Sequence, residues 1–410
     1  MAKIHPFRAI RPIRDKVHLV AARPSYSYKQ NVLEAKLEDN PFTFLHIINP
    51  EFGNEATTKG NTLGRFELVS KRYSEFIEKG ILIQDEAPSL YIYRQTKPGH
   101  VFTGVVCGAS VDEYLNDSIK KHEATLTSRE QMFTEYLDVV GYNAEPVLLA
   151  HKSSKEIENL LNLITTVRAE YEFTTTDLVT HELWKLTPSE NELIIGAFDK
   201  LKELYIADGH HRSASSVRLC EQREEAGSAF KNEKAFLAYI IDESQLDILE
   251  FNRLVKTLNG LTSEKILELI SKSFEVTKTP NKHKPTANHQ FCMCLEGEWY
   301  ELNCKPEIID DMHPVNSLDA EILTQYVLSP ILGIHDLKLD ENISFMSGAE
   351  PIQKLEEKVE SKKYPIAFVL YPATMDQVKR VADNHMIMPP KSTWVEPKLR
   401  SGLTIYNINE

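Results

Sequence analysis

The residues best suited to chemistry lie in one short segment, Asp208-Gly209-His210-His211-Arg212. An arginine guanidinium can bind a phosphate or a carboxylate through two parallel hydrogen bonds, and histidine titrates near neutral pH. A carboxylate such as that of Asp208 can orient a histidine, accept a proton or bind a divalent metal ion. A helix N-cap explains an aspartate, but it does not explain two adjacent histidines followed by an arginine. The segment therefore favours a functional site over a purely structural turn.

The elements expected around this segment point to an anion-binding site. Residues 204–207 form a short apolar run typical of a strand, and residues 211–223 carry apolar side chains at helical spacing. Gly209 between them permits a positive φ or the close approach of a ligand. Free N–H groups and the positive end of the dipole meet at the start of a helix, where they bind anions. A metal site formed by Asp208, His210 and His211 is the alternative, although its spacing matches no common motif.

A second candidate segment contains His122 and Glu123, which together offer a possible base. Such pairs are common, and no second histidine completes a zinc-protease motif. A surface turn explains the pair equally well.

A third candidate is the proline-stiffened loop at residues 388–393, with Lys398 close behind it. Lys391, Ser392 and Thr393 supply an ammonium group and two hydroxyls, which are suitable donors for phosphate. The loop lacks the glycines of a Walker A motif. A stiff loop without a ligand is an equal alternative.

Composition limits the classes of protein to which the chain can belong. With 47 basic and 60 acidic residues the net charge is −13, which argues against a nucleic-acid-binding protein. No apolar run approaches the roughly 20 residues needed to span a membrane. Pro6 and Pro12 interrupt the basic N-terminal segment, so it does not read as a targeting helix. The five cysteines form no disulfide pattern, and we expect a cytoplasmic protein with buried thiols.

Strands and helices alternate along the chain, which predicts an α/β or α+β fold with mixed sheets and flanking helices. The expected strands are residues 90–93, 101–106, 204–207, 236–241 and 365–371, and the expected helices are residues 128–140, 154–167, 211–223, 318–328 and 375–384. The polar segment 277–285 is the best candidate boundary, between a main lobe at residues 1–276 and a C-terminal lobe at residues 286–410. Arg253 follows a strand-like residue and is expected at the surface.

Segments along nearly the whole chain resemble the family catalogued as domain of unknown function 1015. The resemblance is carried by residues 5–8, 40–41, 46–47, 91–95, 122–125, 206–212, 332–334, 388–393 and 397–403. Where many members carry Pro-Pro-Tyr-Asp, this chain has Arg23-Pro24-Ser25-Tyr26. A role for the aspartate of that segment is therefore not carried over.

The central turn is also similar to the Gly-x-His-Arg element of the ParB/sulfiredoxin superfamily, with Gly209, His211 and Arg212 as the matching residues. Members of that superfamily, which include free-serine kinases, hold nucleotide phosphates with this element. The resemblance implies a ParB/sulfiredoxin-like core element and phosphoryl transfer between a nucleotide, or water, and serine or phosphoserine. Mg²⁺ and ADP or ATP are the expected cofactors if a nucleotide is used.

On this hypothesis the candidate residues share one cleft and divide the work. The transferred phosphoryl group is held by the backbone amide of Gly209 and by the side chains of His210, His211 and Arg212. The hydroxyl proton is taken or given by Asp208 or by Glu123, which follows His122. The remaining phosphates or the substrate carboxylate contact Lys391, Ser392, Thr393 and Lys398. The alternatives are a non-catalytic nucleotide-responsive binding protein, which would need a basic face to bind DNA, and a metal-dependent hydrolase. The sequence assigns neither the direction of transfer, nor a metal, nor an oligomeric state.

Overall fold

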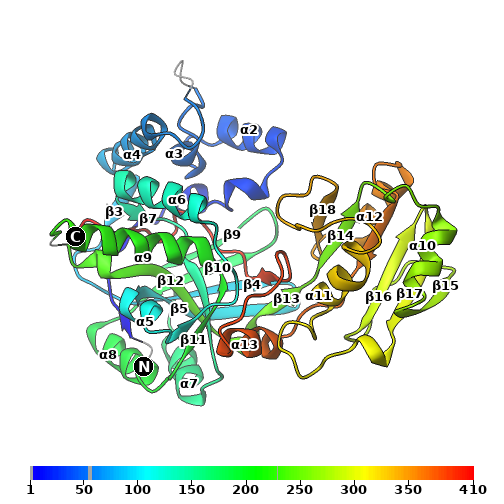
Figure 1. Cartoon of the computed structure of the whole chain (residues 1–410). Helices are drawn as coiled ribbons and strands as arrows, with labels where there is room; N and C mark the ends of the chain where they lie inside the picture. The colour runs from blue at the N-terminus through cyan, green and yellow to red at the C-terminus, as the bar shows by residue number, and fades with distance from the viewer. Residues whose placement is uncertain (1–2, 54–57, 229) are drawn as a thin grey trace. The chain divides into compact units, whose positions relative to one another are not determined.

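The computed structural model describes residues 3–53, 58–228 and 230–410, and it divides into two compact units (Figure 1). The first unit contains Met1–Lys121, Thr125–Leu246 and Pro397–Glu410, and the second contains His122–Ala124 and Asp247–Glu396. The predicted boundary at residues 277–285 thus lies inside the second unit. The reason is that β14 (Phe251–Val255) and β15 (Phe274–Thr279) already pair with strands of the second unit's sheet.

Within the described residues, the first unit is built on a nine-stranded mixed sheet. Its order is β6-β11-β8-β12-β5-β4-β10-β9, and β1 pairs with β5. The strands are β1 (Ile4–His5), β4 (Tyr91–Lys97), β5 (His100–Ser110), β6 (Ile119–Lys120), β8 (Val147–His151), β9 (Tyr171–Thr174), β10 (Thr180–Lys185), β11 (Leu204–Asp208) and β12 (Ala235–Asp242). Only β12 with β8 and β11 with β6 run parallel among the pairs described. The predicted mixed α/β class is therefore confirmed.

Helices pack beside this sheet because each carries one apolar face. They are α6 (Thr127–Val140), α7 (Lys155–Ile164), α8 (Pro188–Phe198) and α9 (His210–Glu225); α6 and α9 lie side by side, as do α7 and α8 (Figure 1). Ser154 caps α7 by accepting the N–H of Ile157. The helix predicted from residue 128 begins one residue earlier, at Thr127.

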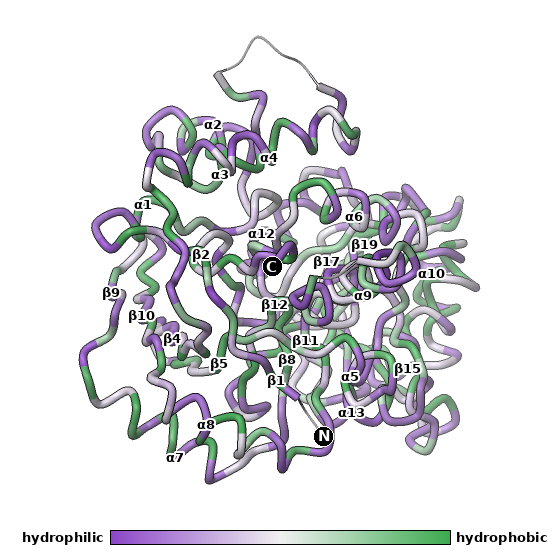
Figure 2. Tube along the Cα trace, turned by 90° about the vertical axis from the view of Figure 1, so that its left-hand side faces the viewer, coloured by the Kyte–Doolittle hydropathy of each residue, from purple (hydrophilic) through white to green (hydrophobic). Residues whose placement is uncertain are grey.

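The side chains of β8 and β12 are buried on both faces of the sheet, so both strands can be apolar throughout. Figure 2 shows them mostly in green, whereas α2 (Gln30–Asp39) is more hydrophilic. Three helices of the N-terminal part contribute to a separate apolar cluster that includes Phe44: α1 (Val17–Val20), α3 (Leu45–Ile48) and α4 (Leu63–Glu78). Across the part of the chain that is described, none of the helices combines the length and the apolar character that crossing a membrane requires.

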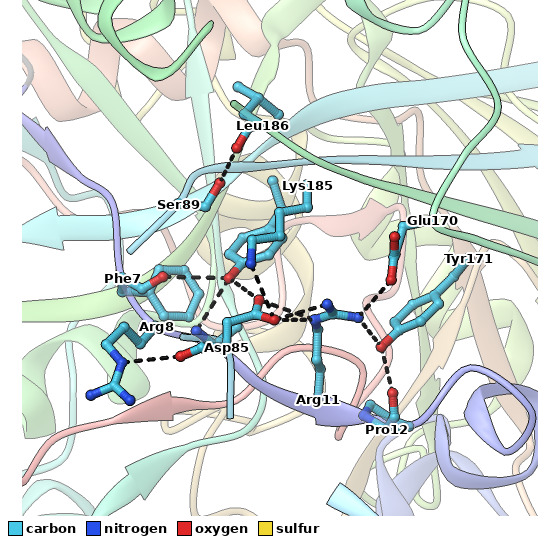
Figure 3. A network of polar contacts seen from close by, with 12 residues as sticks. Phe7, Arg8, Arg11, Pro12, Asp85, Ser89, Glu170, Tyr171, Lys185 and Leu186 are labelled. Carbon is cyan, nitrogen blue, oxygen red and sulfur yellow. Dashed lines mark hydrogen bonds and ion pairs between the residues drawn. The ribbon is translucent and has the colours of Figure 1, made fainter. Parts of the chain in front are cut away.

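A buried ion-pair network ties the N-terminal segment to the sheet of the first unit (Figure 3). The Arg11 guanidinium, 7% exposed, bonds the Asp85 carboxylate, 5% exposed, with Nη2 2.8 Å from Oδ1 and Nε 3.0 Å from Oδ2. Asp85 also accepts the hydroxyl of Tyr91 at 2.6 Å and lies 3.3 Å from the ammonium of Lys185. Arg11 in turn lies 3.2 Å from Glu170. Burial raises the pKa of Asp85, but the bonds from Arg11 and Tyr91 outweigh it and leave the pKa lowered.

The second unit contains a six-stranded antiparallel sheet in the order β15-β17-β16-β19-β14-β18. The remaining strands are β16 (Gln290–Leu295), β17 (Glu298–Cys304), β18 (Ile343–Ser347) and β19 (Ile366–Val369). The apolar cluster on one face includes α10 (Ser263–Ile270) and α11 (Asp319–Leu323), and the cluster on the other face includes α12 (Ile352–Glu360). Cys292 and Cys294 both belong to the second cluster as buried free thiols, as predicted, and burial raises the pKa of both.

Candidate functional site

The predicted strand, turn and helix are all present at the central segment. Strand β11 ends at Asp208, Gly209 adopts φ +103°, and α9 begins at His210. A β-carbon at residue 209 would lie 2.9 Å from Nε of Arg212, so the position needs glycine for its backbone conformation and for space. The first N–H groups of α9 have no carbonyl four residues earlier within the helix. The turn thus has the backbone of an anion site.

Arg212 folds back over the turn instead of extending into solvent. Its Nη1 donates to the Glu145 carboxylate and, at 2.9 Å, to the carbonyl oxygen of Pro146. Its Nη2 donates to Oδ2 of Asp208 at 3.4 Å. The Arg212 side chain is 27% exposed and links two carboxylates, that of Asp208 at the end of β11 and that of Glu145 in the loop before β8. It is therefore positioned at the turn while remaining accessible to a ligand.

Lys398 completes this cluster from the far end of the sequence. Its ammonium lies 3.3 Å from Oδ2 of Asp208. The segment after residue 396 returns to the first unit, where the amide of Ser401 donates to the carbonyl of Ala22 at 2.8 Å. The structure thus brings together Asp208, Arg212 and Lys398, which the sequence predicted for one site, and adds Glu145, which it did not.

The charges around the turn act differently on its two carboxylates. Burial raises the pKa of Asp208, but Lys398 and Arg212 outweigh it, and the pKa is lowered. Burial also raises the pKa of Glu145. Arg212 lowers that pKa, but the negative charge of Asp208 adds to the effect of burial, and the pKa of Glu145 stays raised. Asp208 is therefore the carboxylate that remains ionised most readily.

His210 differs from the expectation that both histidines titrate near neutrality. It is 4% exposed, and burial lowers its pKa to about 3, against the attraction of Asp208. His210 is accordingly a neutral imidazole at pH 7. His211 is half-buried in the first turn of α9, where its carbonyl accepts the hydroxyl of Ser215 at 2.7 Å.

An apolar pocket of about 190 Å³ adjoins the turn within the first unit. Its apolar wall includes Phe44, Ile48, Phe133, Tyr136, Leu137, Tyr142, Val147, Phe236 and Leu237, and its polar wall includes Ser25, Asn143, Glu145, Arg212, Ser215, Ser216 and Ser401. A ring or hydrocarbon group would fit such a wall, and an anion attached to it would meet the guanidinium of Arg212. No local pattern of residues predicts the pocket, because its walls come from segments that are distant in the sequence. The one available signal was that Ser401 lies in residues 397–403, which carry the family resemblance, and that Ser25 lies in residues 23–26, where the chain departs from the family.

The pair His122 and Glu123 belongs to the second unit. His122 is buried, and its carbonyl accepts the amide of Met388 at 2.8 Å, whereas Glu123 is exposed. A cleft shared by this pair and Asp208 stays a prediction.

The loop with Lys391, Ser392 and Thr393 also belongs to the second unit. Lys391 is exposed with φ +57°, and its ammonium lies 5.2 Å from the ring centroid of Phe251. Ser392 is buried and donates its hydroxyl to the carbonyl of Pro389 at 2.7 Å, while Thr393 is half-buried. Phosphate binding by this loop stays a prediction.

Gly209→Ala is expected to destabilise the protein by about 1–2 kcal/mol, because alanine disfavours a left-handed backbone. It should also weaken anion binding, since the new methyl group meets the Arg212 guanidinium. Gly196→Ala is the matched control, because Gly196 lies in helix α8 with open space around it and without a positive φ. That control should stabilise the protein by about 0.5–1 kcal/mol. Equal unfolding midpoints for the two variants would contradict the strained turn.

Comparison with known proteins identifies the family of the chain but not an activity. A family model described as "Protein of unknown function (DUF1015)" matches residues 4–321. No curated protein matches the chain.

Solved structures give weak matches. A free serine kinase in complex with AMP is 13% identical with a TM-score of 0.36, over 73% of this chain and 91% of that chain. A conserved hypothetical protein from Pyrococcus furiosus is 14% identical with a TM-score of 0.35, over 73% and 94%. SbnI from Staphylococcus aureus, truncated at its C-terminus, is 12% identical with a TM-score of 0.37, over 71% and 82%. Similarity at this level does not establish a shared activity.

Proposed function

The chain belongs to the DUF1015 family, and we propose that it is a phosphoryl-transfer enzyme acting on serine or phosphoserine. The observation that carries the proposal is the left-handed turn at Gly209, where Arg212 and Lys398 flank an ionised Asp208. Helix-start amides and a guanidinium are the donors that a phosphoryl group needs. A carboxylate held ionised next to them can accept a hydroxyl proton.

The proposed step places a phosphoryl group between the amides at the start of α9 and the guanidinium of Arg212. In the synthetic direction the serine hydroxyl attacks the terminal phosphorus of a nucleotide, its proton passes to Asp208, and the bond to the leaving phosphate breaks. In the hydrolytic direction water attacks the phosphorus of phosphoserine, and a water proton passes to Asp208. The bond between phosphorus and the serine oxygen breaks, that oxygen takes the proton, and serine and inorganic phosphate leave. Most of the rate enhancement in either direction would come from positioning and charge stabilisation.

His210 has a restricted role in this proposal. Since it is neutral at pH 7, it supplies no positive charge to a phosphate. A neutral imidazole can still accept a hydrogen bond or hold the Asp208 carboxylate in place. We therefore assign the charge stabilisation to Arg212 and Lys398, and a positioning role to His210.

The apolar pocket beside Arg212 supports a ligand that joins a ring to an anion, as a nucleotide does. Mg²⁺ would arrive with the nucleotide phosphates, which supply most of its oxygen ligands in such enzymes. Of the two carboxylates at the turn, Asp208 is the one that fits this ion. Its Oδ2 already faces the cations of Arg212 and Lys398, so these charged groups fit an anion better than a divalent ion without a nucleotide.

The test is to incubate the full chain with phosphoserine, with and without ADP and Mg²⁺, and to measure phosphate, ATP and serine. ATP formation indicates a kinase running in reverse, and phosphate release without nucleotide indicates a phosphatase. Activity that is lost with a chelator and independent of nucleotide would indicate a metal-dependent hydrolase instead.

Arg212→Ala separates binding from catalysis. Loss of the guanidinium should weaken nucleotide or phosphoserine binding about tenfold to hundredfold, because a charge-assisted bond contributes roughly 1.5–3 kcal/mol. Turnover should fall further, since such contacts strengthen in the transition state. Arg218→Ala, on the same helix and 3.9 Å from Glu130, is the control and should leave both unchanged. If the parent protein binds nucleotide without turnover, and Arg212→Ala abolishes that binding, the result would support a non-catalytic binding protein instead.

The roles proposed for Glu123 and Lys391, which belong to the second unit, are tested by two separate variants. If Glu123 takes part in proton transfer, Glu123→Gln lowers turnover while binding of phosphoserine persists. If Lys391 holds a phosphate or the substrate carboxylate, Lys391→Met raises KM. Unchanged kinetics in both variants would confine the site to the first unit.

A further inference from the structure

Arg253 is a fully buried cation in the middle of the second unit. It lies on β14, opposite Phe345 of β18 and Phe368 of β19, and its exposure is 0%. The expectation of a surface arginine is therefore wrong. Its neighbours in the sheet place the side chain against an apolar layer, where an unpaired charge is costly.

The hydrogen bonds of Arg253 leave one edge of the guanidinium open. Nη1 donates to the carbonyl of Phe251, and the guanidinium carbon lies 5.3 Å from the ring centroid of Phe345. Nε and Nη2 have no hydrogen-bond partner among the residues that the structure describes. These two nitrogens form the edge that binds a carboxylate or phosphate through parallel hydrogen bonds.

The acidic residues nearby do not neutralise this charge. Glu250 and Asp319 line a small cavity of about 10 Å³ that Phe251 also lines. Glu250 is paired with Lys284 at 2.9 Å, and Asp319 lies 3.6 Å from His289. Burial lowers the pKa of Arg253 to about 9, and no carboxylate acts against that shift. Within the described part of the chain, no carboxylate is thus paired with Arg253.

A second cation lies close to the same strand. The ammonium of Lys391 is 5.2 Å from the ring of Phe251, whose carbonyl accepts Nη1 of Arg253. The two cations thus contact opposite parts of one residue. Lys391 has φ +57° and belongs to the loop that the sequence predicted to bind phosphate.

We propose that the free edge of Arg253 binds a small oxyanion, a phosphate or carboxylate group. Because Arg253 is fully buried, the anion reaches it only when neighbouring side chains move aside. This site lies in the second unit, does not depend on the turn at Gly209, and goes beyond the proposed reaction.

The experiment measures thermal unfolding of the full chain in sodium phosphate, sodium acetate and serine, each against sodium chloride at equal ionic strength. All variants carry Arg212→Ala, so that anions bound at the turn do not contribute. We expect phosphate or acetate to raise the Tm by about 2–4 °C, a shift typical of one saturated weak site. Adding Arg253→Met should abolish this rise, and Arg253→Lys should reduce it, because lysine lacks the two-nitrogen edge.

Arg380→Met is the control, since Arg380 is the same residue type in the same unit and donates to the carbonyl of Asp311. It should leave the anion-dependent rise unchanged. A rise with phosphate alone identifies a phosphate site, and a rise with acetate and serine identifies a carboxylate site. No rise in the Arg212→Ala protein, or an equal rise with Arg253→Met, would overturn the proposal. If Arg253→Met does not fold, the comparison with Arg253→Lys decides.

Discussion

Asp208→Asn is expected to lower the turnover number of the proposed phosphoryl transfer by about 10²–10⁴-fold, the usual contribution of a general base. Asparagine keeps the size of the side chain, so Arg212 and Lys398 should stay in place, but it cannot accept the hydroxyl proton. Binding of phosphoserine or nucleotide should change much less than turnover. Single-turnover kinetics and equilibrium binding on the same preparation measure both quantities.

The control for this variant is Asp199→Asn, because Asp199 is the half-buried residue that follows α8 in the first unit and is not part of the charged cluster at the turn. It should behave like the parent protein. Full turnover in Asp208→Asn would show that Asp208 serves only to orient the two cations, and Glu123 would then be the remaining candidate base.

The lowered pKa of Asp208 also has a consequence for stability. A carboxyl group whose pKa is lower in the folded state stabilises the fold at all pH values above its unfolded pKa, near 3.8. That stabilisation is lost as the pH falls through the folded value. The free energies of unfolding of the parent and Asp208→Asn should therefore differ at neutral pH and converge in acid.

Asp85→Ala is expected to destabilise the first unit by about 3–5 kcal/mol, the typical effect of removing one partner from a buried ion pair. The substitution leaves the Arg11 guanidinium buried with Glu170 as its remaining acid, and it leaves Lys185 next to an empty position. Urea unfolding at neutral pH measures the change.

Two further variants define the cause. Lys155→Gln breaks the exposed ion pair with Glu158, 2.7 Å long, and should change stability little. Arg11→Met combined with Asp85→Leu removes both buried charges and should recover much of the loss. A loss in the double variant equal to that in Asp85→Ala would show that packing, and not the uncompensated charge, is responsible.

Local features of the sequence predicted much of the fold. The predicted strands at residues 90–93 and 101–106 and the predicted helices at residues 154–167 and 375–384 each depend on a few neighbouring residues. The strand, glycine and helix at residues 204–225 are local in the same sense. Their positions could be read from side-chain type and spacing alone.

Long-range features could not be predicted in that way. Glu145 reaches Arg212 only because β8 and β11 are neighbours in the sheet. Arg253 is buried because β14 lies between two partner strands, which nothing in its local sequence indicates. The boundary of the first unit depends on where residues 397–410 return. Each of these follows from strand pairing between distant segments.

Because residues 397–410 belong to the first unit, the charged cluster at the Gly209 turn can be completed only late in protein synthesis. Residues 247–396 of the second unit leave the ribosome after most of the first unit and before Lys398. Until then Asp208 has Arg212 as its cationic neighbour but not Lys398, and Ala22 lacks its bond to Ser401. Although N-terminal domains usually complete their folding first during synthesis, this one is completed last. A nascent chain therefore carries the turn without its second cation, and the proposed activity can begin only after the second unit has been made.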